Sequence, residues 1–89
     1  MLARTQIVNT EASVYTCPSG KTAYIYVDVV SDDGSDVSIT IKVGDGTTNY
    51  VYWTGTTDFV SAKLVLTAGD VVKVATTGTV NVFVHGQEL

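Results

Sequence analysis

Few side chains in this 89-residue chain have the type and spacing that catalysis needs. The chain contains one histidine, His85, and one cysteine, Cys17. Nucleophilic catalysis needs a nucleophile beside a base and a third group that orients the base. Cys17 precedes Pro18 in a turn and has no activating neighbour in sequence, while His85 lies near the end of the chain. We therefore expect no enzymatic activity, and we expect Cys17 to be a buried small apolar group or a surface thiol without a role.

Two short segments have some features of ligand sites. Gly20-Lys21-Thr22 matches the end of a phosphate-binding loop, but the full motif needs a glycine where Tyr15 stands, so a hairpin turn is expected. The segment Asp32-Asp33-Gly34-Ser35-Asp36 carries hard oxygen ligands that suit calcium. Its spacing differs from that of an EF-hand loop, which favours a solvated acidic turn and leaves calcium binding open. No other pattern indicates a metal or a cofactor, and none is expected.

The charge pattern excludes two classes of partner. Nine acidic and five basic residues give a net charge of −4. Nucleic acids and anionic membranes are bound largely through clustered lysine and arginine. Here the basic residues are scattered singly, as Arg4, Lys21, Lys42, Lys63 and Lys73.

The sequence also carries no pattern expected of a membrane or secreted protein. It has no apolar run of ~20 residues that would span a membrane, and no N-terminal apolar stretch typical of a signal peptide. One unpaired cysteine fits synthesis in a reducing compartment.

The elements that position these residues are predicted to be β-strands. Sixteen valines and fourteen threonines are branched at Cβ, which favours a pleated sheet over a helix. Apolar and polar residues alternate in segments separated by glycine-rich turns. The clearest segments are 22–30, 36–43, 50–54, 59–66, 70–75 and 80–85, with 13–16 and 7–8 as weaker ones. The prediction is an all-β fold, a single small antiparallel β-sandwich, jelly-roll-like, with seven or eight strands.

The domain is predicted to span residues 13–89, because residues 1–12 have a weak hydrophobic pattern. That segment is expected to be an N-terminal arm, either disordered or docked on a neighbouring subunit. A chain this small buries little apolar surface, and a single cysteine excludes an internal disulfide. Self-association is therefore a hypothesis for how the fold gains stability.

The alternation also places aromatic rings on the second face of the strands. Four tyrosines are the candidate protein interface: Tyr24, Tyr26, Tyr50 and Tyr52. The last two share an outer face if Val51 and Trp53 point inward, and Tyr15 and Phe83 are further candidates for the same surface. The alternative is that these rings are cross-strand neighbours that only shield the sheet from water.

Three segments carry a resemblance to a known group of proteins. They are Thr16-Cys17-Pro18-Ser19-Gly20-Lys21-Thr22-Ala23, then Leu66-Thr67-Ala68-Gly69-Asp70-Val71-Val72, and a valine-alternating final strand ending in His85-Gly86-Gln87-Glu88-Leu89. With them the chain resembles small β-sandwich accessory proteins of tailed bacteriophages, the capsid cement or decoration subunits.

The resemblance implies a virion structural protein, made in the host cytoplasm and located on the capsid surface. It implies contacts with the major capsid protein or another virion protein, often as a homotrimer, and it leaves open whether the site is on the head or the tail. No site residues carry over from that group.

A carbohydrate- or receptor-binding module of the tail-fibre or lectin type is the alternative function. Sugar sites commonly combine an aromatic ring with Asp or Asn side chains. The residues that would supply them are Asn49, Tyr50, Tyr52, Trp53 and Asp58. The position of Trp53 separates the two functions: an exposed ring beside Asp58 favours sugar binding, and a ring buried between the sheets favours a structural subunit.

Overall fold

The structure, a computed structural model of all 89 residues, consists of β-strands joined by short turns. The strands are β1 Ala3–Val8, β2 Glu11–Thr16, β3 Thr22–Ser31, β4 Val37–Gly44, β5 Asn49–Thr57, β6 Phe59–Thr67, β7 Val71–Thr76 and β8 Thr79–Glu88. The predicted all-β class is confirmed, and no helix long and apolar enough to cross a membrane is present.

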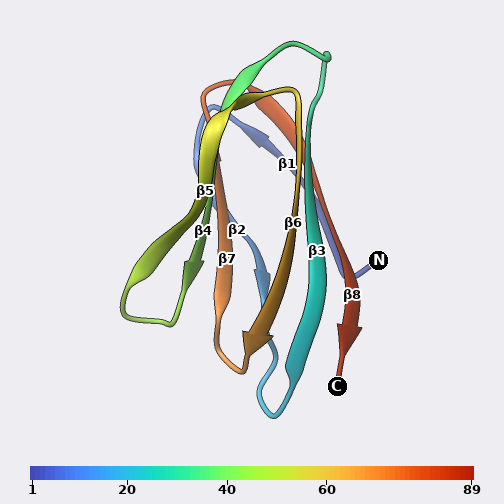
Figure 1. Cartoon of the computed structure of the whole chain (residues 1–89), viewed down its shortest axis with the longest axis vertical. Helices are drawn as coiled ribbons and strands as arrows, with labels where there is room; N and C mark the ends of the chain where they lie inside the picture. Colours follow the sequence, from blue (N-terminus) through green and yellow to red (C-terminus); the bar gives the residue numbers. More distant parts are fainter.

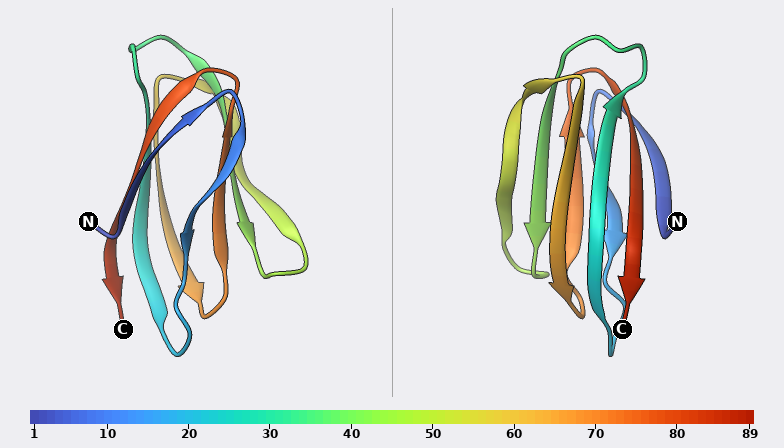
Figure 2. Two further views of the ribbon diagram at one scale, coloured as in Figure 1. Left: turned by 180° about the vertical axis from the view of Figure 1, so that it is seen from behind. Right: turned by 45° about the vertical axis from the view of Figure 1, so that its right-hand side comes forward.

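The eight strands form two antiparallel four-stranded sheets that face each other (Figure 1). Sheet A has the strand order β1-β8-β3-β6, and sheet B has the order β2-β7-β4-β5. Every connection takes the chain from one sheet to the other, except that between β4 and β5, which form a hairpin in sheet B (Figure 2). This strand order is that of a jelly roll; the sequence predicted a jelly-roll-like sandwich without the order of its strands.

The core lies between the sheets and is built from alternate residues of nearly every strand. On β3, Ile25, Val27 and Val29 are at most 1 % exposed, while Tyr24 and Tyr26, which alternate with them, point to solvent. Sheet B contributes Ile39, Ile41, Val72 and Val74, all fully buried. Because side chains of a strand alternate between its faces, the same strands that close the core also present a second set of residues outward.

Two β-bulges interrupt this alternation, one on each edge strand of sheet B. Val14 of β2 and Tyr52 of β5 have no partner in the strand register. A bulge adds one residue to one strand, so side chains beyond it change faces relative to a regular strand. This explains why the faces predicted for β2 and β5 differ from those observed.

The segment expected to be an N-terminal arm is instead part of the sandwich. Residues 3–8 form β1, which pairs with β8 along its whole length, and Ile7 is a core residue with 2 % exposure. The polar residues between the apolar ones made the pattern look weak. They are exposed because β1 is an edge strand whose outer face meets solvent.

Candidate protein interface

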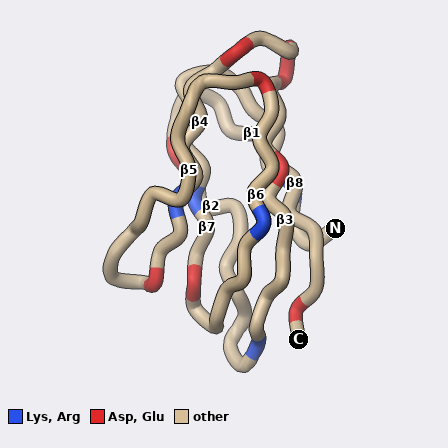
Figure 3. Tube along the Cα trace, in the orientation of Figure 1, with Lys and Arg blue, Asp and Glu red and all other residues tan.

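The outer faces of the two sheets differ in chemistry. The outer face of sheet B is mostly polar away from Val51 on its edge strand, with Ser38, Thr40, Lys42, Thr54, Thr56 and Lys73 among its residues. The outer face of sheet A exposes large apolar and aromatic side chains, namely Tyr24, Tyr26, Phe59 and Val65. Six of the nine acidic residues lie in the connections rather than on the strands (Figure 3). Sheet A therefore presents an aromatic surface with little negative charge.

Strand register determines which side chains meet on this outer face. Tyr24 of β3 lies between Val65 of β6 and Gln87 of β8, and Tyr26 lies between Lys63 and His85. The Tyr26 and His85 rings are stacked, with centroids 5.6 Å apart and planes at 20°. The Lys63 ammonium is 6.0 Å from the Tyr26 centroid, at the outer limit of a cation–π contact. Cross-strand pairs of this kind hold the exposed rings in fixed positions.

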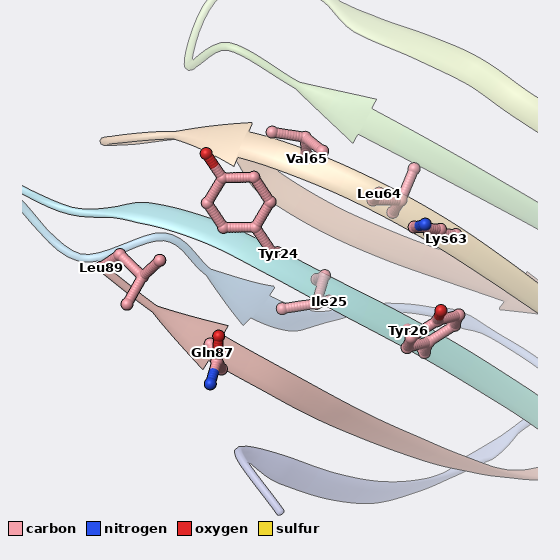
Figure 4. A pocket seen from close by; sticks show the side chains of 8 residues that line it. All are labelled: Tyr24, Ile25, Tyr26, Lys63, Leu64, Val65, Gln87 and Leu89. Atoms are coloured by element: carbon pink, nitrogen blue, oxygen red, sulfur yellow. The ribbon is translucent and has the colours of Figure 1, made fainter.

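An open groove of about 400 Å³ runs between these rings and β6. Its exposed walls are formed by Tyr24, Tyr26, Lys63, Val65, Gln87 and Leu89. In Figure 4 the two tyrosine rings stand on β3, with Lys63 and Val65 on one side and Gln87 and Leu89 on the other. A mostly apolar groove with one ammonium group in its wall suits an apolar side chain that has a carboxylate nearby.

Gly86 brings β8 close to β3 beside this groove. Its φ is +147°, a conformation that residues with a side chain rarely adopt. A Cβ at this position would lie 2.1 Å from the carbonyl oxygen of Tyr24 and 2.8 Å from the Cα of Ile25. β3 and β8 can therefore approach this closely beside Tyr24 only because residue 86 is a glycine.

Next to the groove, three polar side chains are tied together across β6, β3 and β8. The Ser61 hydroxyl donates to Asp28 Oδ1 at 2.5 Å, and His85 Nε2 donates to Asp28 Oδ2 at 2.8 Å. Burial raises the pKa of Asp28, but the hydrogen bonds from Ser61 and His85 outweigh it and hold the pKa below its usual value.

This arrangement orders the surface but does not build a nucleophile. Ser61 donates to Asp28 and not to His85, so the imidazole is not placed to take the serine proton. The sequence missed the cluster because β3, β6 and β8 are far apart in the chain. The available signal was that Asp28 alternates in phase with Tyr24 and Tyr26.

The four candidate tyrosines fall into two groups. Tyr24 and Tyr26 are 49 % and 43 % exposed on the outer face of sheet A. Tyr50 and Tyr52 lie on β5, the edge strand of sheet B, so the four rings do not share one face.

The faces of β5 also differ from the prediction on one side of its bulge. Trp53 points inward and packs against the core, as expected. Val51 does not point inward: it pairs with Lys42 on the outer face and is 58 % exposed. The Tyr52 hydroxyl donates to the backbone carbonyl of Lys63 at 3.2 Å and so reaches across from sheet B to sheet A.

The two further aromatic candidates also separate. Phe83 lies on the outer face of sheet A, opposite Asp28, and is partly buried. Tyr15 is not on a surface: it is 9 % exposed, and its hydroxyl donates to Glu88. Burial, with the hydrogen bond and negative charge of Glu88, raises the pKa of Tyr15 well above its usual value. The bulge at Val14 is what turns Tyr15 inward.

The residues considered for sugar binding do not form one site. Asn49 and Asp58 stand at opposite ends of β5, roughly 30 Å apart at the usual rise of a strand. The Trp53 ring packs over Gly55, where a Cβ would lie 2.8 Å from its Cη2 atom. Trp53 is thus held against the core rather than standing exposed beside Asp58.

The remaining motifs have structural explanations. Lys21 donates its backbone N–H to the Pro18 carbonyl, which makes the expected turn, and the Cys17 side chain is buried. Asp33 accepts hydrogen bonds from Ser35, which lower its pKa. The Asp32 side chain accepts from Gln6 and Asn81 instead. No group of three or more His, Cys, Asp or Glu side chains is placed to hold a metal ion.

Comparison with known proteins adds no relative to these observations. No protein-family model, curated protein or solved structure matches the chain. The groove and the aromatic surface of sheet A are therefore the features of the molecule that point to a function.

Proposed function

We propose that this protein is a virion structural subunit, a cement or decoration protein that binds the outer shell of a tailed phage. It binds through the outer face of sheet A, with Tyr24 and Tyr26 in the contact. One observation carries the proposal: exposed aromatic and apolar side chains line a groove on the outer face of sheet A, while those of sheet B, Tyr50, Val51 and Tyr52, are confined to its edge strand β5. Aromatic residues are enriched at protein interfaces, and such one-sided patches mark interaction sites.

The shape of the molecule suits lateral attachment to a larger surface. Its extents are 39 × 26 × 17 Å, and the strands run along the longest of these dimensions (Figure 1). A specific protein interface buries about 800 Å² on each partner. Sheet A has four strands of up to ten residues, so its outer face measures roughly 33 × 19 Å at the usual rise and spacing of strands, and such a contact would engage most of it.

Repetition on a shell compensates for a modest individual contact. A subunit that touches two neighbouring shell proteins, or two copies of itself, binds the second at a high effective concentration. Self-association into a trimer is part of the proposal, because it links several sheet A faces in one particle. Sedimentation at micromolar concentration checks that part, and a lone 9.4-kDa species contradicts it.

Quantitative mass spectrometry of purified phage particles tests the proposed function. Isotope-labelled peptides of this protein and of the most abundant shell protein give the copy number per particle. Hundreds of copies support a shell subunit, and a few to a dozen copies place the protein at the tail instead. Absence from particles made by cells that express the protein overturns the proposal.

A further inference from the structure

The four edge strands of the sandwich are not equally protected against pairing with another chain. Natural proteins blunt exposed edges with bulges, short strands, charges or proline. In sheet B, both edge strands, β2 and β5, contain a bulge. In sheet A, β1 has six residues, but β6 has nine residues, a regular register and no proline. β6 is therefore the longest regular edge of the molecule.

Strand register identifies which backbone groups of β6 face outward. In an antiparallel pair, alternate residues direct their N–H and C=O groups toward the partner strand. Thr67 exchanges hydrogen bonds with Asp70, and the Lys63 carbonyl accepts from Tyr52, so both residues face away from β3. By this alternation Ser61 and Val65 also direct their backbone groups to the open edge.

The ends of this edge are occupied and its middle is open. The Thr57 hydroxyl bonds to both backbone groups of Phe59, and Asp70 bonds to both of Thr67. Between them, the only side chain bonded to the edge is Tyr52, on the Lys63 carbonyl. The segment from Ser61 to Val65, here called the β6 window, thus keeps donors and acceptors at the spacing of a strand.

We infer that the β6 window accepts an extended segment of the partner protein as a fifth strand of sheet A. The segment places a carboxylate beside Lys63 and an apolar side chain in the groove next to Val65. Main-chain hydrogen bonds supply the attachment, and the groove supplies the selectivity. The inference deepens the proposed function and rests on it in one respect, that the shell protein supplies the segment.

The charges select another protein rather than a second copy of this chain. Lys63 has no carboxylate within 4.0 Å, since the two ion pairs of the molecule are Lys42–Glu11 and His85–Asp28. Two β6 strands paired antiparallel about the window would place Lys63 opposite Lys63. Like charges directly opposite destabilise a strand pair, whereas an acidic residue opposite Lys63 stabilises it.

Tyr52 must leave the Lys63 carbonyl before a strand can use it. Tyr52→Phe removes that hydrogen bond and keeps the ring. Because one hydrogen bond is exchanged for another on binding, we expect the variant to bind about two- to tenfold tighter than wild type. Unchanged binding would mean that the carbonyl of Lys63 does not take part.

A proline substitution tests the window directly, with a matched control. The N–H of Val65 faces the open edge, so Val65→Pro removes no hydrogen bond inside sheet A, and edge strands tolerate proline there. Val65→Thr is the control, because it keeps the N–H and a branched side chain. Binding is measured by co-sedimentation with particles assembled without the protein, after circular dichroism has shown that both variants fold.

The expected result is that Val65→Pro and Lys63→Glu each bind at least tenfold more weakly than wild type, and that Val65→Pro also binds at least tenfold more weakly than Val65→Thr, which keeps the N–H. If wild type binds and Val65→Pro binds equally well, the strand-addition inference fails and the proposed function stands. If wild type does not bind the particles, both fail.

Hydrogen exchange of wild type gives a variant-free measurement, should Val65→Pro not fold. The amides of Ser61, Lys63 and Val65 should exchange rapidly in the free protein and become protected on particles. Equal exchange in both states overturns the inference.

Discussion

Replacing both exposed tyrosines of β3 with threonine should release the protein from its partner while leaving the sandwich folded. Threonine keeps the preference for strand structure and removes the rings. Tyr24 and Tyr26 point away from the core, so the change opens no internal cavity. The loss of cross-strand contacts should lower the free energy of unfolding by about 0.2–1 kcal/mol per ring.

The expected loss of binding follows from the exposure of the two rings. Tyr24 and Tyr26 are 49 % and 43 % exposed in the free protein. With about 200 Å² for a whole side chain, the pair leaves roughly 180 Å² available to a partner. At ~25 cal/mol per Å² its burial contributes up to about 4.5 kcal/mol. Because threonine retains part of that area, we expect a loss of about 2–4 kcal/mol, or about 30- to 1,000-fold in affinity.

A double variant of the other sheet is the control for this experiment. Tyr50→Thr with Val51→Thr removes side chains that are 59 % and 58 % exposed on β5. Binding to particles is measured by co-sedimentation over a range of protein concentrations, and folding by thermal unfolding. The reasoning is refuted if the β5 variant loses binding and the Tyr24→Thr, Tyr26→Thr variant keeps it.

Three further predictions concern the fold that holds this surface. Gly86→Ala should lower the free energy of unfolding by about 2–5 kcal/mol, because the added Cβ clashes with β3 and the φ of this residue suits glycine. Chemical denaturation measures this free energy, and an unchanged value would contradict the prediction. Because the pKa of Asp28 is lowered on folding, its contribution to stability is present above pH ~4 and is lost as the pH falls below that value. The melting temperature of Asp28→Asn should therefore decrease less between pH ~4 and lower pH than that of wild type, and an equal decrease would contradict this. The raised pKa of Tyr15 keeps its proton on in the folded state, so stability should fall as the pH rises above ~10, and a Tyr15→Phe variant that falls as steeply would contradict this.

Alternation of side chains was enough to predict most of the fold. β3, β4, β6 and β7 begin and end within one residue of the segments expected from the sequence. They are the strands with the regular register that the pattern assumes. The alternation predicts the wrong faces at Val14 and Tyr52, where the strands contain bulges. A bulge shifts the following side chains by one position, and the order of apolar and polar residues in the sequence does not mark it. That shift buried Tyr15 and exposed Val51.

The candidate site was only half visible in the sequence. Tyr24 and Tyr26 alternate on one strand, so their common face followed from local spacing. Their neighbours Lys63 and His85 come from β6 and β8, and only the pairing of distant strands places them beside Tyr26. Strand order and register between distant segments depend on the packing of the whole sandwich, which local patterns do not determine.

Hydroxyl-radical footprinting of the wild-type protein, free and bound to particles, tests the central claim most directly. The exposed tyrosines of the two sheets serve as internal probes, because Tyr24, Tyr26 and Tyr50 are 43–59 % exposed in the free protein. If the outer face of sheet A is the binding surface, oxidation of Tyr24 and Tyr26 falls on binding while that of Tyr50 is unchanged. Protection of Tyr50 with continued oxidation of Tyr24 and Tyr26 would contradict the claim.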